Sequence, residues 1–227
     1  MNKKDFLSGL MKLNKMKALN YSFSQEGEDM IIDRLLNYKE HGFYIDLGAL
    51  HPFRFSNTMH FYDKGWNGIN IDATPGSMKL FEKYRKRDIN LEMGISDKRG
   101  KLVHYEFNEP ALNTFDYQLA KKCEAESDGK YVIVKKVEVE TFPIMDVLDE
   151  YVPENQQIDL LDIDIEGFDD FVIQSIDWTK YKPRIVVVEK PKGKENGRYE
   201  ILEKNDYIIV AMTLGNLIYM RSDYEKA

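Results

Sequence analysis

The chain has 227 residues, with 32 Lys and Arg against 39 Asp and Glu, which gives a formal net charge of −7. This length suits one large α/β domain, and the acidic balance argues against a dedicated nucleic-acid binder. Hydrophobic residues at 43% and aromatic residues at 12% are too frequent for a disordered chain. We therefore expect a folded globular protein with no nucleic-acid partner.

The single cysteine, Cys123, excludes an internal disulfide framework and an all-cysteine zinc site. It lies among charged residues, so we interpret it as an incidental thiol. No apolar run approaches the roughly 18 residues that span a bilayer. Asp5 and Lys12 interrupt any signal-peptide core. These features predict no transmembrane segment and a reducing, cytoplasmic location.

Residues 1–20 are basic, and Phe6, Leu10, Leu13 and Lys17 follow helical spacing. One reading is an amphipathic helix that touches a membrane or an anionic partner. The other, which we favour, is a leading helix that packs on the protein through its apolar stripe. Residues 21–227 are expected to form a single domain.

A helix is predicted over residues 30–36. Ser24 precedes it, and Glu28 and Asp29 lie between the two. Ser24 is expected to be the N-cap, because acidic residues in the next turn suit the positive end of the helix dipole.

Short apolar runs then alternate with helical stretches, which predicts a parallel sheet covered on both faces. The runs are 43–47, 68–71, 89–95, 158–165 and 185–188, and the helical stretches include 77–87, 142–151 and 168–176.

Two further segments interrupt this rhythm. Residues 102–107 and 131–141 indicate strands, so a strand–loop–strand insertion is expected at about 101–141. The polar stretch between them, 108–130, is long enough to be a lid or binding loop. At the tail, 207–212 and 216–220 flank Gly215 and predict an antiparallel hairpin.

Acidic residues close the first two predicted strands. Asp46 and Gly48 end the first, and Asp72 ends the second. Ligands of open α/β sheets bind outside the carboxyl ends of the strands, where an acid can accept hydrogen bonds from ribose hydroxyls. A dinucleotide fingerprint needs further glycines after the first strand, and only Gly48 is present. Either acid alone would suit a helix cap or a loop, but together they favour a nucleoside site without a phosphate cradle.

A third cluster of acids follows the run 158–165. Asp162, Asp164 and Glu166 alternate with apolar residues, and Glu189 closes the next strand. Three acids on one face of a central strand are costly without partners. One interpretation is that they cap the following helix or pair with lysines. The other, which we favour, is that they bind a cation, polarise a substrate hydroxyl, or do both.

These segments together resemble the FkbM-type methyltransferases. The resemblance rests on residues 24–29 (SQEGED), 45–49 (IDLGA), 68–72 (GINID) and 163–167 (IDIEG), and it runs from about Ser24 to Glu189. Those proteins are S-adenosylmethionine-dependent O-methyltransferases, and many act on sugar hydroxyls. The resemblance implies the class I methyltransferase fold, a Rossmann-like three-layer α/β sandwich. Its seven-stranded sheet is mostly parallel with an antiparallel last strand.

The resemblance also assigns the cofactor site. The methionine end of S-adenosylmethionine would lie near Gly48 and residues 24–29, the ribose on Asp72, and the adenine near residues 95–97. The cofactor-binding residues it implies are Gln25, Glu28, Asp29, Asp46, Gly48, Ala49, Asp72, Ser96 and Asp162.

One position departs from the family pattern. Many members have Lys two residues before the Asp of the Asp-x-Glu-Gly motif, where this sequence has Asp162. The exchange of a cation for an anion would change the preferred substrate charge or create a metal site. A divalent metal held by Asp162, Asp164 and Glu166 and a metal-free carboxylate base are therefore alternatives, and we favour the base.

A sugar hydroxyl is a weak nucleophile, so methylation needs a general base. The candidate catalytic residues are Asp164, Glu166, His51 and Glu189. His51 has a suitable intrinsic pKa, but it also suits a loop histidine that fixes the backbone. His60 and His104 are interpreted as structural, and His41 as solvated.

The acceptor is expected to be a sugar or a nucleotide-sugar, bound between residues 52–55 and 108–130. Aromatic faces suit sugar rings, and amides suit hydroxyls; the residues expected to contact the sugar are Arg54, Tyr105, Asn113 and Tyr117. An NAD-dependent sugar oxidoreductase or epimerase and a catalytically silent interaction subunit are the alternative functions. A homo-oligomer is compatible with the sequence.

Overall fold

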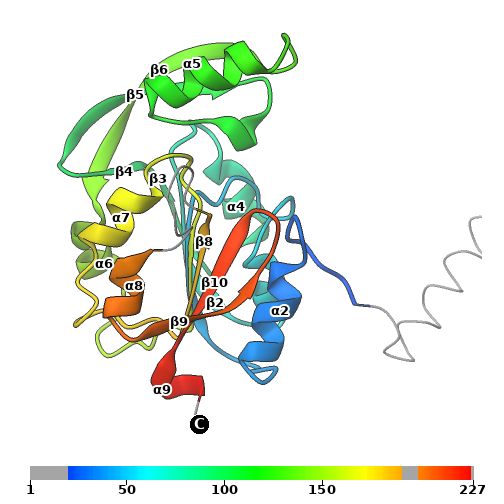
Figure 1. Cartoon of the computed structure of the whole chain (residues 1–227), viewed down its shortest axis with the longest axis vertical. Helices are drawn as coiled ribbons and strands as arrows, with labels where there is room; N and C mark the ends of the chain where they lie inside the picture. The colour runs from blue at the N-terminus through cyan, green and yellow to red at the C-terminus, as the bar shows by residue number, and fades with distance from the viewer. Residues whose placement is uncertain (1–19, 191–198, 226–227) are drawn as a thin grey trace, which may run out of the picture.

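The computed structural model describes residues 20–190 and 199–225. The amphipathic helix expected at the N-terminus lies almost wholly outside the described residues. Two sheets carry the fold, one of seven strands and one of three. Figure 1 shows the smaller sheet stacked against one end of the larger.

The large sheet has the strand order β3-β2-β1-β7-β8-β10-β9. All neighbouring pairs from β3 to β8 are parallel, whereas β10 runs antiparallel to both β8 and β9. This confirms the expected class I methyltransferase fold, including the antiparallel last strand. The strands are β1 (Phe43–Leu47), β2 (Asn67–Asp72), β3 (Ile89–Glu92), β7 (Leu160–Ile163), β8 (Ile185–Glu189), β9 (Tyr207–Met212) and β10 (Asn216–Arg221).

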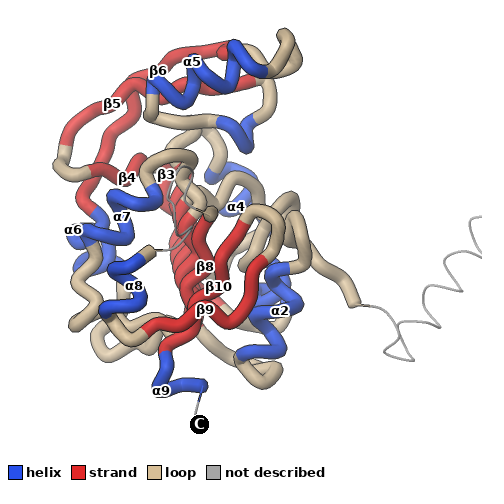
Figure 2. The backbone as a smooth tube through the Cα atoms, in the orientation of Figure 1, coloured by secondary structure: helices blue, strands red, loops and turns tan. Residues whose placement is uncertain are grey.

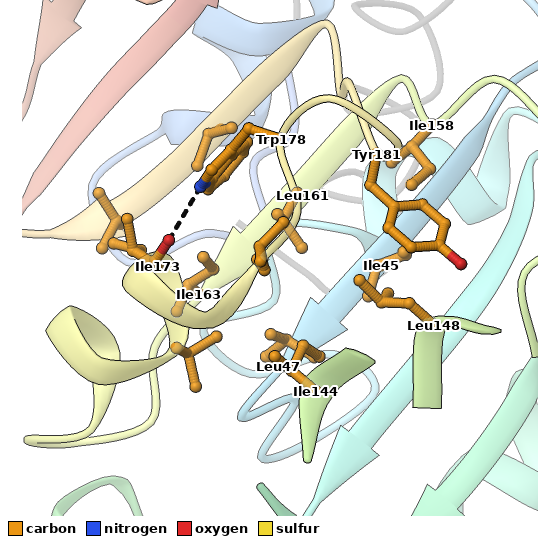
Figure 3. Packing of buried hydrophobic residues seen from close by; sticks show 14 of the residues in the cluster. Ile45, Leu47, Ile144, Leu148, Ile158, Leu161, Ile163, Ile173, Trp178 and Tyr181 are labelled. Carbon is orange, nitrogen blue, oxygen red and sulfur yellow. Dashed lines mark hydrogen bonds between the residues drawn. The ribbon is translucent and has the colours of Figure 1, made fainter. Parts of the chain in front are cut away.

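The central strands are apolar throughout because both faces of the sheet are covered. On β1, Ile45 and Leu47 belong to one buried cluster and Tyr44 to another on the opposite face. This alternation follows from the two-residue period of a strand. Figure 3 shows the first cluster, where the indole nitrogen of Trp178 also donates a hydrogen bond of 2.9 Å to the carbonyl oxygen of Ile173.

Two groups of helices form the outer layers, which completes the predicted three-layer sandwich (Figure 2). Buried residues of α6 (Ile144–Tyr151), α7 (Asp169–Ser175) and α8 (Glu200–Lys204) pack in the first cluster. Those of α2 (Glu28–Leu35) and α3 (Met59–Asp63) pack in the second. Helix α4 (Met78–Tyr84) packs through Met78 and Phe81 on Ala49, and α9 (Ser222–Glu225) follows β10.

The predicted strand 89–95 is wrong in one respect, because the structure divides it between the two sheets. Strand β3 ends at Glu92, and β4 (Gly94–Ser96) joins the small sheet. The chain crosses at Gly94, where a Cβ would lie only 2.6 Å from the Phe115 ring. A local apolar pattern cannot show such a crossing, since the packing partner is distant in sequence.

The small sheet has the order β4-β6-β5, and two of its strands come from the segment where the strand–loop–strand insertion was expected. Strand β5 (Gly100–Phe107) runs antiparallel to β6 (Ile133–Pro143). The segment 108–130 between them is not a simple loop. It contains the 3-10 turn η1 (Pro110–Leu112) and the helix α5 (Tyr117–Glu126), whose N-cap Asp116 accepts hydrogen bonds from two backbone amides.

The expected N-cap Ser24 is also wrong. Helix α2 begins at Glu28, and its N-cap is Gly27 with a left-handed φ of 86°. Ser24 instead accepts a hydrogen bond at its Oγ from the backbone amide of Asp29, at 3.0 Å. The described part of the chain contains no helix that is both long and apolar enough to cross a bilayer.

Candidate active site

A cavity of about 450 Å³ lies at the carboxyl ends of the central strands. Its walls come from the segments after β1, β2, β7 and β8, from the β9–β10 turn, and from the inserted segment. Of the predicted site residues, those that line it are Gln25, Gly48, Arg54, Asp72, Asn113, Asp164, Glu166 and Glu189.

Asp72 marks one end of the cavity. Its side chain accepts hydrogen bonds from the backbone amides of Leu50, at 3.0 Å, and Thr74, at 2.8 Å. A carboxylate has about four lone-pair positions, so two backbone donors fix its orientation and leave acceptor capacity. Ile71, Ala73 and Met93 supply apolar wall beside it. The arrangement suits a nucleoside, with ribose on the carboxylate and base against the apolar wall.

Gly48 holds the loop after β1 against the residue that follows β7. Its φ is +87°, and a Cβ there would lie 1.7 Å from the carbonyl oxygen of Asp164. Its backbone amide donates to the Ile71 carbonyl at 2.9 Å. The glycine is therefore required by close packing of three strand ends, in addition to any approach of a ligand. Ala49, next to it, is buried on α4 and does not line the cavity.

The side chains of Asp46 and Asp162 are buried among the central strands and do not line the cavity. They are register neighbours on β1 and β7, only 3% and 5% exposed. Thr58 donates its hydroxyl to Asp46 at 2.7 Å, and Asn57 donates its amide to Asp162 at 3.1 Å. Burial raises the pKa of Asp46 to about 6. Burial, together with the Asp46 charge, raises the pKa of Asp162 well above its usual range.

Arg85, a buried arginine that the sequence analysis did not identify, is connected to this acid pair by hydrogen bonds. Arg85 is fully buried and forms a salt bridge of 2.9 Å with Asp88. Its guanidinium also donates to the hydroxyls of Tyr44, at 2.8 Å, and Thr58, at 3.0 Å. Because the Thr58 hydroxyl accepts a hydrogen bond from Arg85 and donates one to Asp46, the arginine is linked to the acid pair through one hydroxyl.

Carboxylates gather at the other end of the cavity. Asp164 follows β7, and Glu166 and Glu189 lie beside the same space. Asp164 is exposed and opens into the cavity. Partial desolvation by the protein atoms around it, followed by the charges of Glu166, Asp169 and Glu189, raises the pKa of Asp164 well above its usual range. Such a carboxylate holds a proton more tightly and is a stronger base when ionised.

The backbone at Glu166 has a left-handed φ of 41°, which is uncommon for a residue with a side chain. Leu50 and Phe55 also line the cavity with left-handed φ values of 52° and 57°. Thr114 donates its hydroxyl to the Glu166 carbonyl oxygen at 2.6 Å, which ties the strained turn to the insertion. Strained backbone of this kind is concentrated at functional sites.

The metal site suggested for Asp162, Asp164 and Glu166 is not formed. The side chain of Asp162 is buried and accepts a hydrogen bond from Asn57, whereas Asp164 and Glu166 line the cavity. Within residues 20–190 and 199–225, no three His, Cys, Asp or Glu side chains are placed to hold a metal ion.

The segment before α2 forms a side wall with the β9–β10 turn. Glu28 is fully buried and accepts hydrogen bonds at one carboxylate oxygen from Thr213 and Asn216, both at 2.8 Å. Glu26 accepts the backbone amide of Gly215 at 3.0 Å. These contacts bring Gln25 and Glu26 to the cavity.

Asp29 has a different place from the one implied by the resemblance. It accepts hydrogen bonds from the Ser22 hydroxyl, at 2.6 Å, and the Phe23 amide, at 2.7 Å, and does not line the cavity. Glu28 likewise does not line the cavity, and its hydrogen bonds hold the side wall together. Ser96 is also buried away from the cavity, and its hydroxyl donates to the Lys98 carbonyl at 2.8 Å.

The inserted segment covers the Asp72 end. The amide nitrogen of Asn113 donates to Thr74 at 3.1 Å, and Arg54 forms a two-pronged ion pair with Glu109 at 2.8 and 2.9 Å. Arg54, Glu109 and Asn113 all line the cavity. The rings of Tyr105 and Tyr117 contact each other at 5.7 Å between centroids but lie outside its lining.

The structure places His51 and His104 differently from the sequence prediction. The Nδ1 of His51 accepts the amides of Phe53 and Arg54, both at 3.1 Å, so it fixes its loop, and it does not line the cavity. Burial, with the Arg54 charge, lowers the pKa of His51. His60 pairs with Asp33, as a structural histidine would. His104, interpreted as structural, lines the cavity instead.

Sequence reasoning missed several lining residues. Glu26 lies within the quoted segment 24–29, so its neighbours gave a signal. Asn57 lies between β1 and α3, within the stretch from Ser24 to Glu189 that the resemblance spans. His104 and Asn216 gave no local signal, since each reaches the cavity only through pairing with a distant strand.

The fold and the acid-lined cavity can now be compared with known proteins. The sequence model of the methyltransferase FkbM domain matches residues 46–214, which is most of the chain. The chain belongs to the FkbM methyltransferase family. It is accordingly an S-adenosylmethionine-dependent methyltransferase. This favours methyl transfer over the NAD-dependent and silent-subunit alternatives. No curated protein sequence matches this FkbM-family chain significantly.

Solved structures give weaker likenesses. A candidate O-methyltransferase from Klebsiella pneumoniae is 8% identical with a TM-score of 0.44, over 95% of this chain and 89% of that one. The 1,6-didemethyltoxoflavin-N1-methyltransferase of Burkholderia thailandensis, solved with 1,6-didemethyltoxoflavin and S-adenosylhomocysteine, is 12% identical with a TM-score of 0.40, over 95% and 84%. The fold assignment of this FkbM-family chain rests on its strand order.

The cavity of this FkbM-family enzyme fits S-adenosylmethionine. Its volume lies within the usual range of small-molecule sites, roughly 300–1,000 Å³. Asp72 offers acceptor capacity beside apolar wall, as ribose and adenine require. At the other end, Asp164, Glu166 and Glu189 complement the positive sulfonium and ammonium groups.

Proposed function

We propose that this enzyme methylates a hydroxyl of a sugar, a nucleotide-sugar or a surface glycan, with Asp164 as the general base. One observation carries the proposal. Asp164 opens into the cavity that Asp72 also lines, and partial desolvation together with the charges of Glu166, Asp169 and Glu189 raises its pKa well above the usual carboxyl range. A carboxylate of that basicity, beside a nucleoside site, is suited to accept a proton from a weak nucleophile.

S-adenosylmethionine supplies an electrophilic methyl group when it is bound. The chain's residues then have three tasks. Asp72 and the wall around it hold the nucleoside, and the turn at Gly48 fixes its distance from Asp164. Asp164 takes the hydroxyl proton as the oxygen attacks. Holding the reacting atoms in line contributes roughly 7–11 kcal/mol to lowering the barrier.

Glu166 and Glu189 act beside the base. Their charges contribute to the raised pKa of Asp164. Both line the cavity, where carboxylates are able to accept hydrogen bonds from further sugar hydroxyls. Arg54 and Asn113 are the acceptor-side candidates that also line it, whereas Tyr105, Tyr117 and His51 would act only through other residues.

The test is mass spectrometry of sugars, nucleotide-sugars and glycans after incubation with the enzyme and S-adenosylmethionine. Asp164→Asn should lower turnover by about 10²–10⁴-fold, because the amide cannot accept the proton. Glu166→Gln should also impair turnover, and both variants should bind S-adenosylhomocysteine within a few-fold of the wild type. Asp63→Asn, an exposed acid outside the cavity, is the matched control.

Two outcomes would overturn the assignment. Near-normal rates in both Asp164→Asn and Glu166→Gln would make the carboxylates structural. Loss of activity on chelation, restored by magnesium, calcium or manganese, would replace the metal-free base with a metal-assisted reaction. The cytoplasmic location and the homo-oligomer stay predictions of the sequence.

A further inference from the structure

His104 lies on β5 of the inserted sheet, outside the strands that carry the other acids of the site. It is only 3% exposed and yet lines the cavity. Its Nδ1 is buried without a hydrogen-bond partner. Among the described residues, only one other buried side-chain polar atom, Ser77 Oγ, lacks a partner, and Ser77 does not line the cavity.

A buried nitrogen without a partner is unfavourable, because it has lost its bond to water and gained none. Such groups in native proteins call for an explanation, and one explanation is a ligand that completes the bond. Burial also lowers the pKa of His104, so the imidazole is neutral at physiological pH. A neutral ring has one donor and one acceptor nitrogen. It also avoids repulsion with a sulfonium cation.

The surroundings of His104 place it at the nucleoside end. Its ring packs against Phe115, with centroids 4.8 Å apart, and the same phenyl ring fits against Gly94. After burial, the charge of Asp72 has the largest effect on the pKa of the imidazole and acts to raise it, ahead of the charge of Glu106. Asn113, from the same insertion, bonds to Thr74, two residues beyond Asp72.

We propose that His104 binds the nucleoside of S-adenosylmethionine through its imidazole, so that the insertion supplies part of the cofactor site. Adenine and ribose together offer donors and acceptors that a neutral imidazole is able to meet. The inserted sheet is thereby a nucleoside cover and not only a wall for the acceptor. This inference rests on the use of S-adenosylmethionine and is independent of the acceptor proposed above.

Calorimetry with two ligands tests it. S-adenosylhomocysteine contains the whole cofactor skeleton, whereas 5′-methylthioadenosine contains the nucleoside without the amino-acid end. His104→Phe keeps an aromatic ring against Phe115 but removes both nitrogens. It should weaken both ligands about tenfold and by the same factor, the usual effect of a lost buried hydrogen bond. His104→Gln, which keeps a donor and an acceptor, should recover part of the affinity.

Two control variants show whether a loss of affinity is specific to the nucleoside. Gln25→Ala, in the lining segment that the resemblance assigns to the methionine end, should weaken S-adenosylhomocysteine more than 5′-methylthioadenosine. His41→Ala, an exposed histidine outside the cavity, should change neither. Histidine ¹⁵N spectra supply a second readout, since the signals of the His104 imidazole should shift when either ligand is added.

Several results would overturn the inference. Wild-type affinity of His104→Phe for both ligands would make the residue structural. Weakening of S-adenosylhomocysteine alone would place it at the amino-acid end. Unchanged imidazole signals in the saturated protein would show that the ring makes no contact. If the wild type bound neither ligand, the cofactor assignment itself would fail, which is a separate outcome.

Discussion

Asp46 and Asp162 face each other across β1 and β7, with both carboxyl groups buried and each held by a polar residue of the loop after β1. This chain thus has two acids side by side on neighbouring strands. Two buried carboxylates placed side by side cannot both ionise cheaply, so the pair favours a bound proton.

This pair makes stability depend on pH. The pKa of Asp46 is about 6 in the folded protein, above its unfolded value. A raised carboxyl pKa means that the folded state binds the proton more tightly. The stabilisation is therefore complete at low pH and is lost as pH rises through about 6.

Asp46→Asn should reduce that loss. We expect the fall in unfolding free energy between pH 5 and pH 7 to shrink by about 1 kcal/mol, because roughly one of the two pKa units of the shift is expressed in that pH window. Urea unfolding at the two pH values measures it. The exposed Asp97→Asn should leave the difference unchanged, and an equal fall in Asp46→Asn and wild type would contradict the prediction.

Arg85→Met should destabilise the protein strongly. The substitution leaves Asp88 without its buried partner and removes the donor to Thr58 and Tyr44, and breaking a buried pair costs about 3–5 kcal/mol. Arg99→Met, which removes the exposed ion pair with Asp146, should have little effect on unfolding. Similar midpoints for the two variants would show that the buried network is not needed.

Gly27 and Gly48 have nearly the same backbone conformation but different surroundings. Their substitutions therefore separate the cost of a left-handed backbone from the cost of a steric clash. Gly27 and Gly48 have φ of +86° and +87°, but a Cβ on Gly27 meets nothing within 4 Å, whereas one on Gly48 would overlap the Asp164 carbonyl. Gly27→Ala should cost roughly 1–2 kcal/mol, for the left-handed backbone alone. Gly48→Ala should cost clearly more in denaturant unfolding and also weaken S-adenosylhomocysteine. Equal costs would mean that the two strand ends separate easily.

Asp72→Asn should weaken S-adenosylhomocysteine by about tenfold or more, because hydrogen bonds to a charged group are worth about 1.5–3 kcal/mol. Calorimetry measures the affinity. Glu92→Gln is the matched control, since Glu92 is the register neighbour of Asp72 on β3 but does not line the cavity. Unchanged affinity in Asp72→Asn would remove the ribose from this residue.

Hydrogen exchange should divide the insertion into two parts. Residues 109–115 line the cavity, so their amides should become more protected when S-adenosylhomocysteine or an active acceptor binds. Helix α5 does not line it, and its protection should change little. Uniform protection across 108–130, or none, would contradict this division.

The sequence by itself determined the strands of the central sheet, although the run 89–95 extends past the end of β3. Residues 43–47 form β1 as predicted, and the hairpin around Gly215 forms as predicted. Both follow from local pattern, since an apolar run between turn residues suits a strand buried on both faces. The acids Asp72, Asp164 and Glu189 were found for the same reason, because a strand end is a local feature that also marks the ligand edge of the sheet.

Only the tertiary structure decided which of these acids reach the cavity. Asp162 and Asp164 are two residues apart, yet one is buried against Asp46 and the other is open, because β7 ends between them. Glu28 was assigned to the cofactor but accepts hydrogen bonds from Thr213 and Asn216, which lie more than 180 residues further along the chain. His104 reaches the site because β5 pairs with β6, and no local pattern encodes that pairing. Side-chain roles depend on contacts between segments distant in sequence, whereas strands and turns depend mainly on their own residues.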